Sequence, residues 1–497
     1  MNQKTSLPFL AALGAIVAAA AAALPANAQT VPSPPATVPN PLSLDQAISI
    51  AMAHQPSRFI AATQETSASG AIEQAHSQYF PQVTPSYSYI QNSSTSFQSS
   101  APNGGTTEVD ATEEVFDNGK RELVNAQARR QLEEARDSSR DVKQQVIDTV
   151  TRDYYGLLRA IDLVKVADSQ VKSSQTEVDQ VNAQIKAGTS AAASVYQADA
   201  TLANAQVTLL TDQAGVTTAS AQLKNDIGVD STQDVAPVPL SNDDQLPPAP
   251  PAETPRPLDD YLTIAYANRE DLKAQTVEVA RQDELVKEAE VNAGPQVTGT
   301  IDEEYLKEPD VEAFEPAGWD TRSMLTASWP IFDGGFNKGA IKIAQAARDS
   351  ARDTLVQDRN NVHLAVEQDL ATRTQALNSA SLAETALQAA QVNYDSSVAE
   401  QREGLLTVVD VITAEATLAQ AQENYVSTIY SFYIADADLQ RAIGTNDVTP
   451  TKSPTPTNGP ATNPAAAAST PTTLTPPVVV APPSPTTPQA PTPPAGQ

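Results

Sequence analysis

Two blocks of residues occur twice in the chain, and this duplication is the feature that most limits how it can fold. The tetrapeptide Pro-Gln-Val-Thr at residues 81–84 recurs at residues 295–298, 214 positions further on. The block that begins at Gly188 recurs from Gly404, 216 positions further on, and both blocks contain Ala-Thr-Leu at the same place. A repeat at a fixed distance indicates a repeated structural unit. We therefore predict two units of one architecture, residues 41–230 and 258–446, joined by a Pro-rich connector at 231–257.

Each unit contains a stretch that is too long for a helix of an ordinary globular protein. Residues 118–187 contain no proline, and apolar residues follow one another at intervals of seven from Val150 to Ile185. This spacing indicates a coiled coil, and a helix of that length would extend about 105 Å. Residues 335–403 repeat the pattern with more alanine. Two shorter helices, predicted at 44–79 and 190–227, have nearly the same summed length and would cover the long helix if laid end to end.

Four segments, two in each unit, alternate apolar and polar residues as strands with one apolar face do. They include residues near positions 83, 109, 297 and 325. The apolar faces carry aromatic residues, as the girdles of membrane barrels do, and these residues are Tyr87, Tyr89, Tyr305 and Trp329. The alternative is a water-soluble antiparallel sheet, which would show the same alternation.

Four strands per chain are too few for a membrane barrel, because the smallest bacterial barrels have about eight. Two chains would give eight strands around an interior filled by side chains, whereas three would give twelve and leave a lumen. If the chain forms a channel, a trimer is therefore the first assembly that works. We predict a mainly α-helical fold with a membrane β-barrel: a long coiled-coil tunnel plus four strands per chain, which a homotrimer completes to twelve.

Residues 1–28 have the pattern of a secretory signal peptide. Lys4 precedes an apolar run, and the small residues Ala-Asn-Ala at 26–28 form a cleavage site. A transmembrane anchor is the alternative, but the small-residue site favours cleavage. Beyond this segment there is no run of about 20 apolar residues, the length that a membrane-spanning helix needs. Residues 447–497 are rich in Pro, Thr and Ala, which is typical of a disordered tail.

The charge and the inventory of reactive residues exclude several classes of function. A formal net charge of −29 argues against a nucleic-acid-binding surface. The acidic residues either keep a large surface soluble or line a path that favours cations. The chain has no cysteine and three histidines, and none of these histidines has a second one at metal-ligand spacing. We therefore predict no enzyme, no cofactor and no metal site.

Two motifs, taken with the duplication and the signal peptide, resemble the TolC-like outer-membrane factor family over residues 41–444. One is the strand-to-helix junction WPIFDGG at residues 329–335, and the other is Asp410 six positions after Gly404. The resemblance implies a homotrimer in the cell outer membrane with a tunnel that extends into the periplasm. It also implies a passive exit duct of a tripartite efflux or type I secretion system. The partners would be a periplasmic adaptor (membrane fusion protein) and an inner-membrane pump of the RND, MFS or ABC type.

The resemblance implies roles for individual residues as well. Asp410 would contribute to a carboxylate ring that gates the tunnel, with one carboxylate per chain, since Thr413 and Ser194 stand at the other candidate positions. The strand–helix junction would consist of Phe332, Asp333, Gly334 and Gly335. The periplasmic tips that contact the adaptor would consist of Gly188, Thr189, Gly404, Leu405 and Leu406.

Plainer interpretations of these residues remain open. The tip glycines are of the kind that ends helices whatever the function, and an Asp at a helix start is favoured by the helix dipole. The competing function is a periplasmic coiled-coil scaffold or adaptor protein that never enters the membrane. Such a protein would have small domains of many short strands, not aromatic-faced hairpins at the ends of long helices.

Overall fold

The computed structural model describes residues 38–90, 104–188, 192–230, 232–241, 245–251, 256–307 and 318–446. All of them belong to one compact unit, Met1–Pro454. The predicted signal peptide and the predicted Pro-, Thr- and Ala-rich tail lie outside the described residues. Among the described residues, no helix combines the length and the apolar character needed to cross a membrane.

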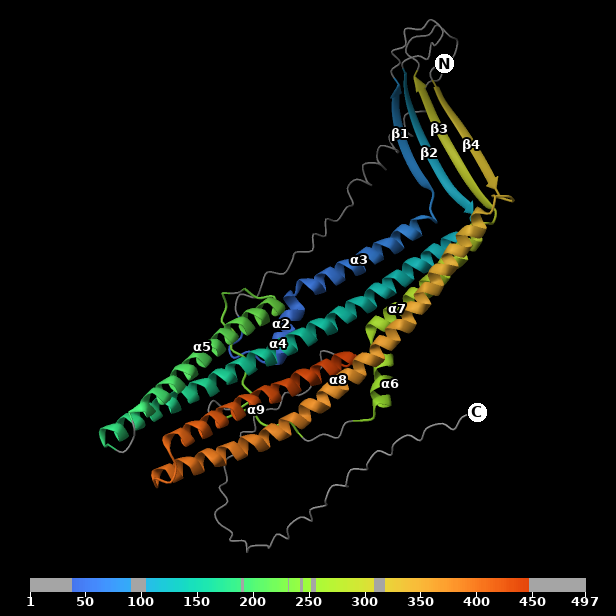
Figure 1. Ribbon diagram of the computed structural model, residues 1–497. Coiled ribbons are helices and arrows are strands. Elements are labelled where there is room, and N and C mark those ends of the chain that lie inside the picture. Colours follow the sequence, from blue (N-terminus) through green and yellow to red (C-terminus); the bar gives the residue numbers. More distant parts are fainter. Residues whose placement is uncertain are drawn as a thin grey trace, which may run out of the picture. The chain divides into compact units, whose positions relative to one another are not determined.

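The described residues contain one run of elements twice: two short helices, two strands, a 67-residue helix and a 35-residue helix (Figure 1). The first run consists of α2 (Leu44–His54), α3 (Pro56–Ser77), β1 (Gln82–Ile90), β2 (Gly104–Phe116), α4 (Lys120–Lys186) and α5 (Ala193–Ile227). The second consists of α6 (Leu258–Asn268), α7 (Glu270–Val291), β3 (Gln296–Lys307), β4 (Gly318–Ser328), α8 (Phe336–Arg402) and α9 (Val408–Ala442).

The shorter helices lie along the long ones, as the helix lengths predicted. Helices α3 and α5 pack on α4, and helices α7 and α9 pack on α8. The heptad stripe of α4 faces its partners, since Val150, Leu157 and Val178 are all buried. On α8 the alanine-rich seam, which includes Ala380 and Ala390, packs on α9. Each unit therefore has a helical hairpin, α4/α5 or α8/α9, at the end away from the strands (Figure 1).

The helix predicted over residues 44–79 is interrupted at Gln55. Gln55 has φ −66° and ψ 122°, because a proline at the next position disfavours the α conformation of the residue before it. The second unit breaks at Arg269, which has nearly the same angles, with no proline after it. There the Arg269 guanidinium donates to Asp271 at 2.6 Å and to the carbonyl of Ala442 at 3.2 Å. Tertiary contacts thus hold the second break.

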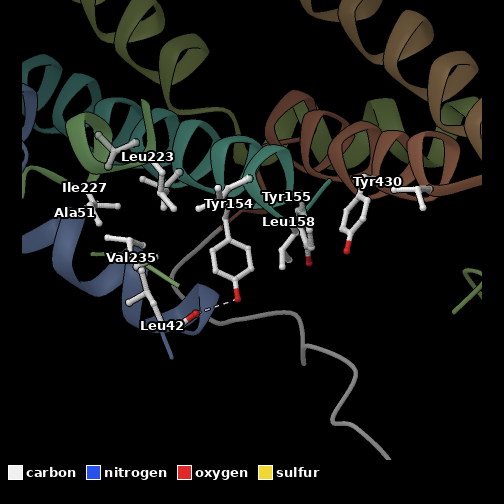
Figure 2. Close-up of a cluster of buried hydrophobic side chains, with 14 of the residues drawn as sticks. Leu42, Ala51, Tyr154, Tyr155, Leu158, Leu223, Ile227, Val235 and Tyr430 are labelled. Carbon is white, nitrogen blue, oxygen red and sulfur yellow. Dashed lines mark hydrogen bonds between the residues drawn. The ribbon is translucent and has the colours of Figure 1, made fainter. Parts of the chain in front are cut away.

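The connector between the units is pinned to the helices. The backbone N–H of Leu42 donates to Ala236 at 2.8 Å, and the N–H of Val238 donates back to Leu42 at 2.9 Å. The Tyr154 hydroxyl donates toward the carbonyls of Leu42 and Val238 at 3.1 and 3.2 Å. Figure 2 shows this side chain within the largest buried cluster, where Val235 of the connector packs. The Pro-rich composition therefore did not reveal that part of this segment is buried.

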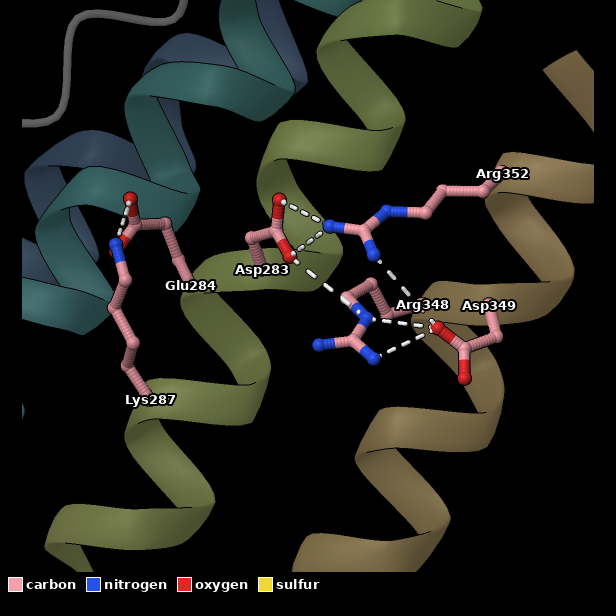
Figure 3. A network of polar contacts seen from close by, with 6 residues as sticks. All are labelled: Asp283, Glu284, Lys287, Arg348, Asp349 and Arg352. Atoms are coloured by element: carbon pink, nitrogen blue, oxygen red, sulfur yellow. Dashed lines mark hydrogen bonds and ion pairs between the residues drawn. The ribbon is translucent and has the colours of Figure 1, made fainter.

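Helices α7 and α8 are held in register near the strands by ion pairs (Figure 3). The guanidinium of Arg352 on α8 lies 3.1 Å from the carboxylate of Asp283 on α7. On each helix a neighbouring pair adds local charge balance, Lys287 with Glu284 and Arg348 with Asp349. Such partly exposed pairs contribute about 0–1 kcal/mol each, so they set the alignment of the helices more than they stabilise them.

The four strands form one antiparallel sheet in the order β1-β2-β3-β4. The hairpins of the two units meet where β2 pairs with β3, for example Ala111 opposite Ile301. Strands β1 and β4 are therefore the two edges of the sheet within the chain. Helix α4 follows β2 in the chain, and α8 follows β4. The sheet therefore lies at one end of these helices, and the helical hairpin tips lie at the other end (Figure 1).

In each unit, a glycine after the last helix packs against the backbone at the break between the two short helices. Gly228 follows α5 and Gly444 follows α9, both with φ near +70°, a conformation that side chains rarely adopt. A Cβ on Gly444 would lie 3.0 Å from the backbone of Asn268 and Arg269. A Cβ on Gly228 would lie 3.2 Å from the backbone of His54. The duplication is thus preserved in a tertiary contact as well as in the order of the elements.

Substitution Gly444→Ala should lower the free energy of unfolding by at least about 1 kcal/mol, because it combines an unfavourable φ with a close backbone contact. Gly215→Ala is the matched control, since Gly215 lies inside helix α5 and a Cβ there meets nothing within 4 Å. The control should stabilise the helix by about 0.5–1 kcal/mol. Thermal unfolding in one detergent compares the two, and equal shifts would contradict this account of Gly444.

Candidate functional site: sheet faces, helix starts and hairpin tips

One face of the sheet is apolar and aromatic at both ends. At the loop end Tyr87, Tyr89 and Tyr305 share this face, and Tyr305 contacts Trp319 with ring centroids 5.1 Å apart. At the helix end the predicted girdle residue Trp329 lies one position after β4 and is 62% exposed. Along β4, Trp319 and Trp329 are ten residues apart, which on a strand tilted by about 45° spans about 24 Å. That height matches the apolar band of a membrane barrel.

The opposite face of the sheet is acidic. The strand register places Asp110 beside Asp302, and Glu108 beside Glu304, which in turn lies beside Asp320. Arg322 on β4, opposite Asp302, is the basic residue of this face among the described residues. The sheet thus has one largely apolar surface, in which Glu303 lies between Val109 and Thr321, and one acidic surface that favours water and cations.

The predicted junction motif folds as a cap for the long helix. The Asp333 carboxylate accepts the backbone N–H groups of Gly335 at 2.8 Å and Asn337 at 2.7 Å. These hydrogen bonds lower the pKa of Asp333. Gly334 and Gly335 have φ of +66° and +94°, which explains why glycine stands at both positions. Phe332 projects outward and is 92% exposed.

The first unit builds the same cap with nearly the same sequence, Phe-Asp-Asn-Gly at residues 116–119. Asp117 accepts the backbone N–H of Gly119 at 3.2 Å and of Arg121 at 2.9 Å. Although partial burial acts in the other direction, these N–H groups and the Arg121 guanidinium lower the pKa of Asp117. In both units, therefore, a carboxylate at the end of a strand satisfies the first free N–H groups of the long helix.

The two hairpin tips turn at the predicted glycines. Gly188 and Gly404 have φ of +74° and +77°, so both end a long helix in the left-handed conformation. Leu405 is 70% exposed at its tip, and Leu406 beside it is half-buried. Thr189 lies outside the described residues. The predicted role of these residues in adaptor contact stays a prediction.

Asp410 lies in the first turn of α9, where it takes part in a capping box. Its carboxylate accepts the Thr407 hydroxyl at 2.6 Å and the Thr407 backbone N–H at 2.9 Å. The Thr407 side chain, and then its backbone N–H, lower the pKa of Asp410. The Asp410 side chain is exposed and ionised, and the hydrogen bonds to Thr407 fix its orientation. Thr407 was not predicted from the sequence, although a Thr three residues before an acidic residue is a known helix-start signal.

A buried junction between α4 and α9 joins the two units. The Tyr430 hydroxyl donates to Asp162 at 2.5 Å, with both side chains buried. Burial raises the pKa of Tyr430, so its hydroxyl keeps the proton that it donates. Nearer the tips Gln170 on α4 donates to Glu415 on α9 at 3.0 Å. The helices run antiparallel here, and Val166 and Val426 belong to the apolar cluster between these polar contacts.

This arrangement of helices, sheet and junction can be compared with known proteins. The family model described as "Outer membrane efflux protein" matches residues 47–229 and 262–445, one segment in each unit. The chain belongs to the outer membrane efflux protein family. Membership places this efflux protein in the outer membrane, in a family of channels.

Individual relatives are distant in sequence and similar in structure. Outer membrane protein TolC of Escherichia coli (strain K12) is 22% identical over 423 residues, which cover 81% of this chain and 83% of TolC. The crystal structure of CusC has a TM-score of 0.69 at 16% identity and covers 84% of this chain and 95% of CusC. The outer membrane protein VceC from Vibrio cholerae has a TM-score of 0.66 at 19% identity, over 81% of this chain and 96% of VceC. The predicted fold class, with its long helices and four strands, is confirmed.

Two aromatic residues of this efflux protein, Trp319 and Tyr430, were not predicted from the sequence. Trp319 follows the same alternation of apolar and polar residues, since counting back by twos from Leu325 reaches it. Tyr430 carried no local signal, because its partner Asp162 is 268 positions away.

In this efflux protein, Tyr430→Phe should lower the free energy of unfolding by about 1–3 kcal/mol, since it removes the hydroxyl donor from the buried carboxylate of Asp162, which then retains its ion pair with Lys165 at 3.0 Å. Tyr433→Phe is the control, because Tyr433 contributes to the junction by stacking on Tyr155, a contact that the phenyl ring keeps. Thermal unfolding at neutral pH compares the two variants. Equal stability of both would show that the hydroxyl of Tyr430 does not hold the junction.

Proposed function

We propose that three copies of this chain form an outer-membrane exit duct that works with a periplasmic adaptor and an inner-membrane pump. The proposal rests on one contact between helices. The chain forms this contact between α4 and α9, whereas it does not form the equivalent contact between α8 and α5. Support for the proposal comes from comparing residues of the two units that are 216 positions apart.

Within the chain, α4 of the first unit packs on α9 of the second. The duplication makes α8 the counterpart of α4 and α5 the counterpart of α9, so an equivalent α8–α5 junction is expected. Val166 and Val426 are 4% and 0% exposed in the first junction, whereas their counterparts Leu382 and Leu210 are 71% and 66% exposed. Large aliphatic residues that are exposed where their repeat counterparts are buried indicate an interface.

The exposed surfaces on the two sides are complementary. On α5 one stripe of apolar residues follows heptad spacing and stays exposed: Tyr196, Ala200, Ala203, Val207, Leu210 and Ala214. On the hairpin α8/α9 a groove is lined largely by small residues, among them Ala386, Ala390 and Ala416, with Leu382 at its edge. Stripe and groove lie at similar distances from the tips, about 6–33 Å by helical rise. A contact between two different surfaces, the stripe of one copy and the groove of the next, forms a ring of copies when the rotation between them closes.

The edge strands of the sheet also need partners from other copies of the chain. Strands β1 and β4 have unpaired edges within the chain, and a sheet in lipid leaves no edge unpaired. Pairing β4 of one copy with β1 of the next would close the ring, and three copies give twelve strands. The acidic faces would then line the lumen and favour cations. The girdle residues Tyr87, Tyr89, Tyr305 and Trp329 would meet lipid.

Leu210→Glu should convert the purified oligomer to monomers, because it places a charge in the proposed contact between copies. Thr208→Glu is the matched control, since this exposed residue lies on the same helix outside the stripe. Native mass measurement in detergent reports the number of chains. A monomeric wild-type protein, or an intact oligomer of the Leu210 variant, would contradict the proposed interface.

We further propose that Asp410 contributes one carboxylate per chain to the gate at the tunnel entrance, beside the adaptor-contact tips at Gly188 and Gly404. Asp410→Asn keeps an acceptor for Thr407 and removes the charge, so the preference for cations should fall. The reversal potential across a planar bilayer under a salt gradient measures this preference. Asp395→Asn, on an exposed face of α8, is the control and should leave the potential unchanged. An unchanged potential for the Asp410 variant removes Asp410 from the gate.

Release of the chain in the soluble periplasmic fraction without detergent would support the alternative of a periplasmic scaffold or adaptor. The apolar sheet face and the family membership favour the duct. A co-purified adaptor and pump would support the tripartite arrangement.

A further inference from the structure

Near the hairpin tips, the junction between α4 and α9 contains two carboxyl groups, Glu177 and Glu415, with no ion pair to either among the described residues. Glu415 on α9 is 3% exposed and accepts the side-chain amide of Gln170. Both carboxylate oxygens of Glu177 on α4 are shielded from solvent, and among the described residues no N–H or O–H group donates to either. The carboxyl of Glu415 is the group that acts on Glu177, through its charge and through a side-chain hydrogen bond that requires a proton on one of the two carboxyls.

In the part of the chain that the structure describes, no positive charge acts on Glu177 to stabilise two carboxylates at once. Helix α5 contributes the apolar side chains of Val195, Ala198 and Leu202, and α9 contributes Ile412 beside them. Helix α8 meets α4 here through a neutral amide pair, Gln180 with Gln401 at 3.0 Å. On α4 itself the Lys172 ammonium is 2.6 Å from Asp168. Glu415 is the charged group, among the described residues, whose charge acts on Glu177.

One proton shared between the two carboxyls resolves this conflict. Burial, and then the hydrogen bond and charge of Glu415, raise the pKa of Glu177 to about 8. With the proton present, a carboxyl–carboxyl hydrogen bond joins α4 to α9. Without it, two buried negative charges repel each other across the junction.

We propose that Glu177 and Glu415 form a proton-operated latch that holds the hairpin α8/α9 against the hairpin α4/α5 near the tips. Loss of the shared proton releases the latch and lets the tips separate. The inference rests on the proposed function for its consequence, a wider tunnel entrance, but the latch itself lies within one chain.

The direction of the pH effect follows from proton binding. The latched state binds the proton with a pKa of about 8, whereas a separated Glu has its ordinary value of 4.5. Between these values the latched state holds one more proton than the released state. The ratio of latched to released chains therefore falls by up to about tenfold per pH unit as the pH rises through this window.

The duplication restricts the latch to the junction within the chain. At 216 positions from Glu177 and Glu415 stand Asn393 and Asp199. The equivalent junction between copies would therefore pair an amide with one carboxylate, and such a pair needs no shared proton.

The test measures the distance between the two hairpins of one chain. Because the chain has no cysteine, Ala187→Cys and Glu403→Cys introduce the two labelling sites at the ends of α4 and α8. The full-length labelled chain is co-produced with an excess of cysteine-free chain, and spin-label distances are recorded from pH 5.5 to 8.5. We expect the distance to lengthen as the pH rises. In Glu177→Gln, whose amide donates to Glu415 at every pH, the short distance should persist.

Asp153→Asn is the matched control. Asp153 forms a similar carboxyl pair with Asp226, and burial raises its pKa to about 8, but this pair joins α4 to α5 inside one hairpin. The control should therefore shift with pH as the wild type does. A distance in the wild type that ignores pH, or a Glu177→Gln variant that shifts like the wild type, overturns the latch. The mass of the same sample reports the number of copies separately, so failure of the proposed trimer is distinguished from failure of the latch.

Discussion

The packing of a long helix of one unit against the last helix of the other is the contact on which the rest of the structure depends. Tyr430 and Asp162 form its buried hydrogen bond, and Val166 and Val426 form its apolar part. The connector covers one side of this region, since the Tyr425 hydroxyl donates to the carbonyl of Pro247 at 2.8 Å. Because the chain is a duplication, an equivalent contact between α8 and α5 is expected, but within one chain the residues that would form it stay exposed.

The sheet, at the other end of the helices, also needs contacts that one chain does not provide. Its apolar face would be unstable in water, and its edge strands carry backbone groups that need partners. Asp117 and Asp333 cap the long helices after the strands end, so backbone hydrogen bonds fix the start of each long helix beside the sheet. A ring of copies thus satisfies the helices and the strands together.

Much of this fold could be predicted from local patterns, since heptads, alternation and glycine positions report directly on local structure. The break at Gln55 is marked by a proline, but the break at Arg269 depends on contacts with Ala442, which no local pattern shows. The burial of the connector depends in the same way on Tyr154 and Tyr425. Asp410 was recognised as a site residue, yet its partner Thr407 and its capping geometry became clear only from the structure. The shared proton of Glu177 and Glu415 arises from residues 238 positions apart.

The central claim is that the unmade junction is completed by a neighbouring copy, and a cross-link tests it most directly. Val166 and Val426 are packed in the junction within the chain, so the claim places their counterparts Leu382 and Leu210 opposite each other across two copies. The double variant Leu210→Cys and Leu382→Cys, in a chain that has no other cysteine, is treated in intact membranes with a short bifunctional maleimide. The account predicts cross-linked species of two and three chains on a denaturing gel, which neither single variant gives. Migration of the double variant as single chains alone would contradict it.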